Sequence, residues 1–273
     1  MATAKELLDA GELGAAIEEL TREVKANPGD LWRRTFLFEL LCFAGEFDRA
    51  ERQLDVVAHQ SAQAEVGVQV YRNLLKAERA RARLFSDGLH PHFLAEPPAY
   101  VDLHLNAINR VREGNLTEAR QLLDQAEEER PALKGKLNGQ PFVDFRDYND
   151  VVGPVLELIV QDKYTWLPLE QVTYIEIPSP KQLRDLMWAS VRVETTDGTI
   201  GEVFLPMLYA NSSQHPNDQV KLGRMTDWKN LGEIIYFAFG LRLFLVGDEE
   251  KAILEVRTIE FDLAAAPDSL PHS

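Results

Sequence analysis

A ten-residue pattern recurs three times in the first half of the chain. It reads GELGAAIEEL from Gly11, GEFDRAERQL from Gly45 and GNLTEARQLL from Gly114. Each copy has Leu or Phe two residues after the glycine, Ala five residues after it and Leu nine residues after it. The first two glycines are 34 residues apart and the next two are 69 apart. The pattern predicts helix, turn and helix, because a small alanine lets two helices approach closely.

This pattern resembles the tetratricopeptide repeat, and Pro28 and Pro131 stand where the closing proline of two units is expected. The array is irregular, because Ala62 replaces the proline of the second unit and the next unit lacks its turn glycine. Residues 63–85 instead predict one long helix, which a proline-bearing loop follows. We therefore expect residues 1–134 to form a short, irregular α-α superhelix.

After about residue 134 the sequence is dominated by strand patterns. Two alternating apolar runs flank Asp197-Gly198, which is a strong signal for a hairpin turn. The run LEQVTYIEIP predicts a further strand, and EIIYFAFG with LRLFLVGDEEKAILEVRTIEF predicts three more. Most of these strands follow one another through short connections, so an antiparallel sheet is expected.

Two helices are predicted among these strands. One begins near Asp147, which can cap it, and runs through DYNDVVGPVLELIVQ with a kink or a late start at Pro154. The other is short, with Ser179 as N-cap, Pro180 in the first position and Gln182 as capping-box partner.

The fold class that follows is α+β in two parts. Residues 1–134 are predicted to form a tetratricopeptide-like helical domain, and residues 135–263 a mostly antiparallel β-sheet domain with short helices. Residues 264–273 are predicted to be a disordered tail.

Charge and composition restrict the partners. The chain has 44 acidic and 29 basic residues, a net charge of -15. This balance disfavours binding to nucleic acid or to an anionic membrane surface, and it fits a basic or amphipathic protein partner or simple solubility. The single cysteine, Cys42, lies in an apolar run and predicts a buried structural thiol. Without an apolar leader or a stretch of about 20 apolar residues, a cytoplasmic protein without membrane insertion is expected.

No motif of catalysis, cofactor binding or metal binding is recognisable. The chain has no GxSxG, GxxxxGK or GxGxxG sequence. His90, His92 and His104 lack the spacing of a zinc site. The cluster of Asp144, Asp147 and Asp150 offers either a cation or acid–base site or a set of helix caps, and we favour the caps. The sequence therefore predicts no catalytic residue, no metal and no cofactor.

Three segments of the second half each place tryptophan beside charged residues: KYTWLP (163–168), SPKQLRDLMW (179–188) and LGRMTDW (222–228). Such residues are typical of binding hot spots, and equally of loops that are anchored to a sheet. For the last segment we predict that Trp228 is largely buried and that Arg224 pairs with a carboxylate or with backbone carbonyls. The candidate partner-contact or family-signature residues are Asp144, Arg146, Asp147, Trp166, Arg184, Asp185, Trp188, Arg224, Asp227 and Trp228.

An ordered set of segments gives these residues a context. LNGQPFVDFRDYNDVVGPVLELI, KYTWLPLEQV, PKQLRDLMWASV, VFLPMLYANS and KLGRMTDW follow one another along the chain. Together they resemble the ImpE family, also called SciE or TagJ, which are accessory proteins of bacterial type VI secretion. The resemblance implies a cytoplasmic adaptor that binds the small subunit of the contractile sheath and is linked to the AAA+ ATPase that recycles the sheath. It implies no enzymatic activity and no cofactor.

Two alternatives stay open from the sequence. In the first, the protein is a hydrolase or transferase whose Asp144, Asp147, Arg224 and Asp227 converge in one pocket. In the second, it is a structural dimer that pairs through strands near IIYFAFGLRLFLV. The sequence leaves the oligomeric state undecided.

Overall fold

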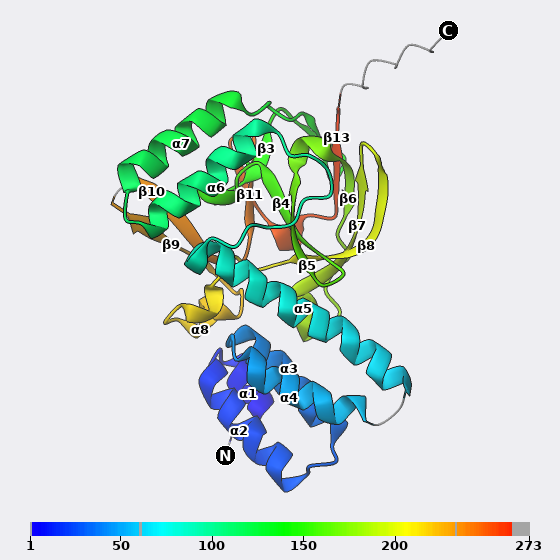
Figure 1. Ribbon diagram of the computed structural model, residues 1–273. Coiled ribbons are helices and arrows are strands. Elements are labelled where there is room, and N and C mark those ends of the chain that lie inside the picture. Colours follow the sequence, from blue (N-terminus) through cyan, green and yellow to red (C-terminus); the bar gives the residue numbers. More distant parts are fainter. Residues whose placement is uncertain (1, 60–61, 233, 264–273) are drawn as a thin grey trace.

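The helices of the first half pack in antiparallel pairs. In this computed structural model, which describes residues 2–59, 62–232 and 234–263, they lead into a sheet half (Figure 1). The helices are α1 (Ala4–Asp9), α2 (Leu13–Ala26), α3 (Leu31–Phe43), α4 (Phe47–Ala58), α5 (Ala62–Asp87), α6 (Ala99–Arg112) and α7 (Leu116–Glu129). We call α1 to α7 the helical half and the elements after them the sheet half.

The turns of the repeat pattern lie where the sequence predicts them. Each turn joins two paired helices and holds a glycine with φ of +83°, +71° or +81°, namely Gly11, Gly45 and Gly114. Left-handed backbone of this kind favours glycine, which has no Cβ. The alanine five residues after each glycine is fully buried, so each helix pair packs as closely as the pattern predicts.

The long helix α5 connects the two halves. It covers the whole of the predicted 63–85 segment and two residues more at its end, and it contacts strand β5 (Lys163–Pro168) of the sheet half. Its N-terminal part lies beside α3 and α4, whereas its C-terminal part reaches the sheet half (Figure 1). One helix therefore belongs to both packing units.

The main sheet has eight strands in the order β2-β1-β13-β6-β7-β8-β4-β5, and every pair is antiparallel. Its strands are β1 (Gly135–Leu137), β2 (Gln140–Phe142), β4 (Val155–Val160), β5, β6 (Val172–Glu176), β7 (Trp188–Thr195), β8 (Gly198–Pro206) and β13 (Thr258–Phe261). The predicted hairpin at Asp197-Gly198 joins β7 to β8. KYTWLP, for which an anchored loop was one of two interpretations, is strand β5.

Two smaller sheets complete the sheet half. One pairs β9 (Thr226–Leu231) with β10 (Ile235–Gly240), and the other has the order β12-β11-β3. The strands of this second small sheet are β3 (Phe145–Asp147), β11 (Leu243–Val246) and β12 (Glu249–Ala252). The region after residue 233 therefore holds four strands, β10 to β13, where three were predicted. The short helices are α8 (Asp218–Lys221) and the 3-10 turns η1 (Asp150–Val152), η2 (Leu169–Gln171), η3 (Leu183–Leu186), η4 (Ser212–Gln214) and η5 (Ile253–Glu255).

The predicted helix after Asp147 is wrong. Only the single 3-10 turn η1 forms there, and Asn149 rather than Asp147 caps it. Pro154 ends the turn, and the apolar run that follows is strand β4, buried along nearly its whole length. The second predicted helix forms as the 3-10 turn η3, but it begins one turn late, with Gln182 in the cap position.

The hydrophobic core crosses from one half to the other. One cluster includes residues of α1 to α7 together with one face of the sheet, where Ile159, Trp166 and Trp188 lie. A second cluster fills the opposite face of the sheet. The division at residues 134/135 stays a prediction, and the predicted tail 264–273 lies outside the described residues. Within those residues, no helix has the length and apolar content needed to cross a membrane.

Candidate functional site

The polar residues that stand out in the sequence gather where the helical half meets the sheet half. Three separate sets of contacts cross this boundary, and we call them together the joint. The first is a buried ionic network between α5, β4 and the residues that flank β11 and β3. The second is made by η3 and the start of β7, and the third by the segment around α8.

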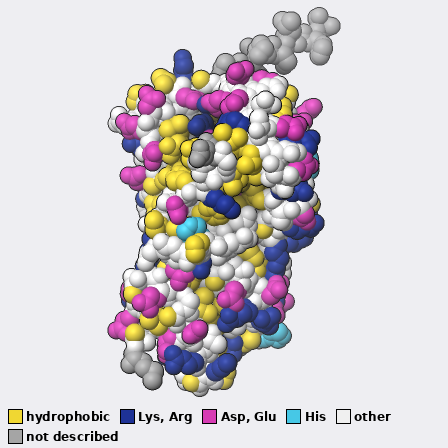
Figure 2. Space-filling view, turned by 90° about the vertical axis from the view of Figure 1, so that its left-hand side faces the viewer, with side chains coloured by type: hydrophobic (Ala, Val, Ile, Leu, Met, Phe, Trp, Pro, Cys, Tyr) yellow, Lys and Arg dark blue, Asp and Glu magenta, His cyan; other side chains and the backbone are white. Residues whose placement is uncertain are grey.

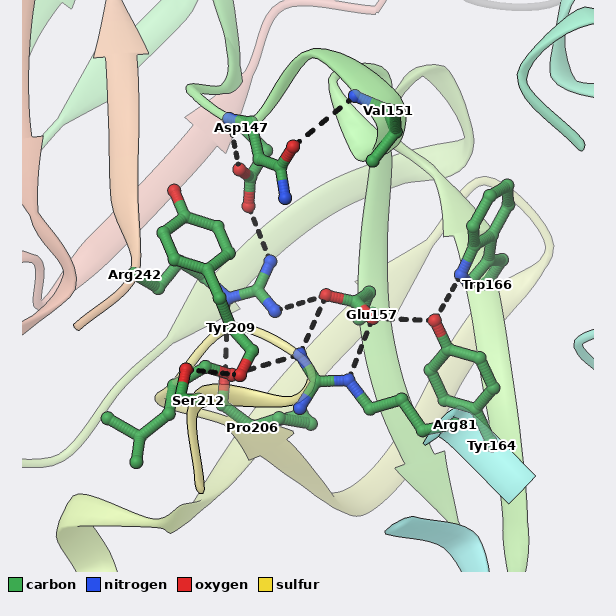
Figure 3. Close-up of polar contacts among 12 residues, drawn as sticks. Arg81, Asp147, Val151, Glu157, Tyr164, Trp166, Pro206, Tyr209, Ser212 and Arg242 are labelled. Atoms are coloured by element: carbon green, nitrogen blue, oxygen red, sulfur yellow. Dashed lines mark hydrogen bonds and ion pairs between the residues drawn. The ribbon is translucent and has the colours of Figure 1, made fainter. Parts of the chain in front are cut away.

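The buried network is centred on Glu157 of β4 (Figure 3). Arg81 of α5 donates to both carboxylate oxygens, with Nε–Oε1 at 2.8 Å and Nη2–Oε2 at 2.9 Å. Arg242 donates to Glu157 and also to Asp147 at the end of β3. At most 2 % of any of these four side chains is exposed. Two cations and two anions therefore compensate each other, as burial of charge requires.

Neutral groups complete the network. The hydroxyl of Tyr164 donates to Glu157 Oε1 at 2.5 Å, and the indole N–H of Trp166 donates to that hydroxyl at 2.5 Å (Figure 3). The ring of Tyr209 lies 5.3 Å from the guanidinium of Arg242. The candidate Trp166 is thus fully buried in a polar cluster, with no surface to offer a partner.

The two carboxylates respond differently to the same burial. Burial raises the pKa of Asp147 to about 6, and Arg242 opposes this effect only in part. Burial alone would raise the pKa of Glu157 as well. The positive charges of Arg81 and Arg242 together outweigh this effect and hold that pKa well below its usual range. Glu157 is therefore the fixed negative charge on which both arginines depend.

The second set of contacts fixes η3 against α3 and α5. Arg184 donates to Glu39 of α3 at 2.9 Å, and its guanidinium lies 5.5 Å from the ring centre of Tyr71. The indole N–H of Trp188 donates to Glu78 of α5 at 2.9 Å. The candidate Asp185 accepts bonds from the backbone N–H groups of residues 181 and 182 and so caps η3. The segment 179–188 is tied to the helical half at two points.

The third set of contacts involves the LGRMTDW segment. Arg224 donates to the carbonyls of Leu8, at 2.7 Å, and Asp9, at 3.1 Å, which end α1. Asp218 accepts from the N–H of Gly14, at 3.2 Å, in the first turn of α2. A cation at a helix C-terminus and an anion at a helix N-terminus both complement the helix dipole. The prediction that Arg224 pairs with backbone carbonyls is confirmed.

The prediction that Trp228 is largely buried is wrong. Its ring packs edge-on against Tyr148, with centroids 4.9 Å apart, but the residue is only partly buried. The reason is that LGRMTDW is not one connection: Leu222 caps the C-terminus of α8, and Thr226 to Trp228 open the two-stranded ribbon of β9 and β10. A two-stranded ribbon cannot enclose a tryptophan on all sides.

The remaining candidates lie apart from one another. Asp144 forms a two-pronged ion pair with Arg130, at 2.6 and 2.8 Å. Arg146 donates to the carbonyl of Asp147 at 3.1 Å. Asp227 lies 3.1 Å from Nε2 of His215.

The four residues of the enzymatic alternative therefore do not share a pocket. Asp144, Asp147, Arg224 and Asp227 each bind a different group, and these groups lie in different parts of the fold. The capping role proposed for Asp147 is also wrong, because its carboxylate belongs to the buried network and to the N–H of Asn149. Among the described residues, no group of three His, Cys, Asp or Glu is placed to hold a metal ion.

A cavity of about 470 Å³ lies beside the joint, between the α3–α4 turn, α5 and residues 208–214. Its lining mixes apolar side chains with arginines that already have carboxylate partners, such as Arg79 with Asp48 and Glu51. The cavity thus adds space but no uncommitted charge. Cys42 nearby is buried, as predicted, and burial raises the pKa of its thiol, which keeps it unreactive.

The sequence interpretation missed the residues at the centre of the joint. They are Glu39, Glu78, Arg81, Glu157, Tyr209 and Arg242. Glu157 and Arg242 carry a usable signal, since each is a lone charge inside an apolar strand run, VLELIV and GLRLFLV. Such a charge must find a buried partner, although the sequence does not say which one.

Fold and joint together define a class of protein: a tetratricopeptide-type helical array locked onto an antiparallel sheet. A tetratricopeptide repeat model matches residues 7–67, and a model described as ImpE protein matches residues 139–260. The chain belongs to the ImpE family.

Two relatives extend this assignment over nearly the whole chain. The type VI secretion system accessory component TagJ of Pseudomonas aeruginosa is 34% identical over 259 residues, which cover 95% of this chain and 91% of the relative. The crystal structure of protein VPA1032 from Vibrio parahaemolyticus superposes with a TM-score of 0.87 at 29% identity, over 94% of this chain and 97% of that one. The ImpE resemblance seen in the sequence is confirmed, and with it an accessory role in type VI secretion.

Proposed function

We propose that the chain is a non-enzymatic, cytoplasmic adaptor of type VI secretion that binds the small sheath subunit and links it to the AAA+ ATPase of sheath recycling. The observation that carries this proposal is the joint. Polar residues that would have to form a reaction centre are instead used to hold the helical half against the sheet half. A rigid scaffold that presents helical surface is what an adaptor needs.

Two further observations support a protein partner. Helical repeats offer an extended face onto which a peptide or a helix can dock. The net charge of -15 favours a basic or amphipathic partner and speeds its approach. The name of the Pseudomonas aeruginosa relative, an accessory component, agrees with a supporting role in a larger machine.

Isothermal titration of the purified chain with the small sheath subunit of its own secretion system tests the proposal. We expect saturable binding with a Kd on the order of 1 μM, as is common for transient adaptors. A second titration adds the recycling ATPase to the preformed complex and measures whether a ternary complex forms. If neither the sheath subunit nor the ATPase binds, the proposal is wrong.

A further inference from the structure

One face of α3 and α5 is covered in part by the protein itself. The η3 turn lies on this face, where Arg184 reaches Glu39 of α3 and stacks on Tyr71 of α5. Leu183 and Leu186 of the same turn are partly buried against the hydrophobic cluster that spans both halves. We call this covered stretch the inner groove. The chain thus shows that this face accepts a helical turn, which Arg184 holds against α3 and α5.

The same face continues beyond η3 without a cover. On α3, Phe36 and Trp32 precede Glu39 by three and seven residues, so all three lie on one side of the helix. Trp32 is 67% exposed, and its ring is 5.5 Å from that of Phe36. On α5, Val66 is 71% exposed and Val70 is 38% exposed. We call these four residues the outer groove.

The two pairs of apolar residues occupy equivalent places in successive repeats. Val66 follows Trp32 by 34 residues, and Val70 follows Phe36 by the same number, which is the distance between Gly11 and Gly45. Equivalent positions of stacked repeats lie side by side on one face. Phe38 of α3 and Tyr71 of α5, whose rings are 5.4 Å apart, show that the two helices are neighbours there.

We propose that the outer groove is a docking site for one short amphipathic helix of a protein partner. The identity of that partner as the small sheath subunit rests on the proposed function. The site is continuous with the inner groove, where a helical turn is already held through Arg184. Each apolar pair spans about 6 Å along its helix, so the site takes two or three anchoring side chains spaced i, i+3 or i, i+4.

The exposed apolar side chains distinguish this site from the rest of the helical surface. A tryptophan with two thirds of its surface in water is unusual unless it binds a partner, because its burial in an interface would remove a large apolar area from water. The inner groove cannot serve an outside partner at the same time, since η3 and Trp188 fill it through bonds to Glu39 and Glu78. A partner helix is therefore expected to end against η3.

The test compares matched surface substitutions in titrations with the purified small sheath subunit. Trp32→Ala and Val66→Asp change the outer groove. Val143→Asp is the matched control, because Val143 is 68% exposed and lies in the sheet half. All three positions are solvent-exposed, so circular dichroism and thermal unfolding should show folded variants. Each outer-groove substitution should weaken binding by roughly 10- to 100-fold, and Val143→Asp by less than about twofold.

The possible outcomes test the docking site in the outer groove separately from the proposed adaptor function. If the unchanged protein binds and the outer-groove variants bind equally well, the docking site is wrong and the adaptor function stands. If the unchanged protein does not bind the sheath subunit, both fail. Sedimentation of the chain alone tests whether a second copy of the chain occupies the outer groove. A dimer that Val66→Asp dissociates would assign the outer groove to that second copy and overturn the proposal.

Discussion

The joint and the outer groove treat side chains in opposite ways. In the ionic network of the joint, arginines and carboxylates are buried and each has a partner, as Glu157 has in Arg81 and Arg242. In the outer groove, apolar side chains such as Trp32 and Val66 are exposed. Residue type alone would suggest the reverse roles. Charged signature residues can therefore be structural, and a binding surface is recognised by exposed apolar groups in repeat-equivalent positions.

The largest effect is expected from Glu157→Gln. The substitution leaves Arg81 and Arg242 without their shared negative charge in a buried site, which should lower the free energy of unfolding by about 3–5 kcal/mol. Urea denaturation measures this change. The control is Glu194→Gln, whose partner Arg192 is exposed, with an expected loss below about 1 kcal/mol. Equal losses for the two variants would show that the network does not hold the halves together.

A pH effect of nearly the same size is expected from His104 of α6, which contacts the carbonyl of Val151 in η1. Burial lowers the pKa of His104 to about 4, from 6.5 in an exposed histidine. As the pH falls from 6.5 to 4, the unfolded chain binds a proton that the folded chain does not. Folding stability should therefore fall by about 3 kcal/mol relative to the variant His104→Asn.

The comparison with the variant is needed because Asp147 acts in the opposite direction. Its pKa is raised by burial to about 6, so protonation of this carboxyl favours the folded state between pH 6 and 3.8. Both proteins carry Asp147, and its contribution cancels in the difference. Parallel stability curves for the two proteins across this pH range would contradict a buried neutral His104.

A smaller effect is expected from Arg224→Ala, which removes two hydrogen bonds to the last carbonyls of α1. Because Arg224 is exposed, the loss should be about 1 kcal/mol, measured by thermal unfolding. Lys229→Ala, an exposed cation on β9, is the control and should change stability by less than about 0.5 kcal/mol. Hydrogen exchange of α1 should rise only in the Arg224 variant.

The smallest effect on stability is expected from Trp32→Ala. Two thirds of the side chain is in water, so its removal should change the free energy of unfolding by less than about 1 kcal/mol, although tryptophan is the largest residue. A loss above about 2 kcal/mol in urea denaturation would show that Trp32 is part of the core. The outer groove would then be a buried structural contact, as the joint is, and not an exposed docking surface.

Much of the fold was predictable because its signals are local. Gly45, Ala50 and Leu54 mark a helix pair by spacing alone, and Asp197-Gly198 marks a hairpin. The helix predicted after Asp147 failed because a short apolar run such as VLELIV is compatible with a buried helix or a buried strand. Pro154 favoured a break at that point, and the break is what the fold has.

The joint was not predictable because its contacts join distant segments. Arg242 lies 95 residues from Asp147 and 85 from Glu157. Arg81 does carry a helical signal, since Leu74, Glu78 and Arg81 share one face of α5 and all three are buried. That face, however, has no distinguishing pattern in a helix with several other arginines. Pairing of this kind is decided by tertiary packing.

The most direct test of the account is hydrogen exchange with and without the small sheath subunit. We expect protection on binding in the first turns of α3 and α5, in peptides covering residues 31–37 and 63–70. Residues 224–231, which include Arg224 and Trp228, should show no change. Protection confined to residues 224–231, with none in α3 or α5, would contradict the account, because the signature segment would then be the interface and the outer groove would not.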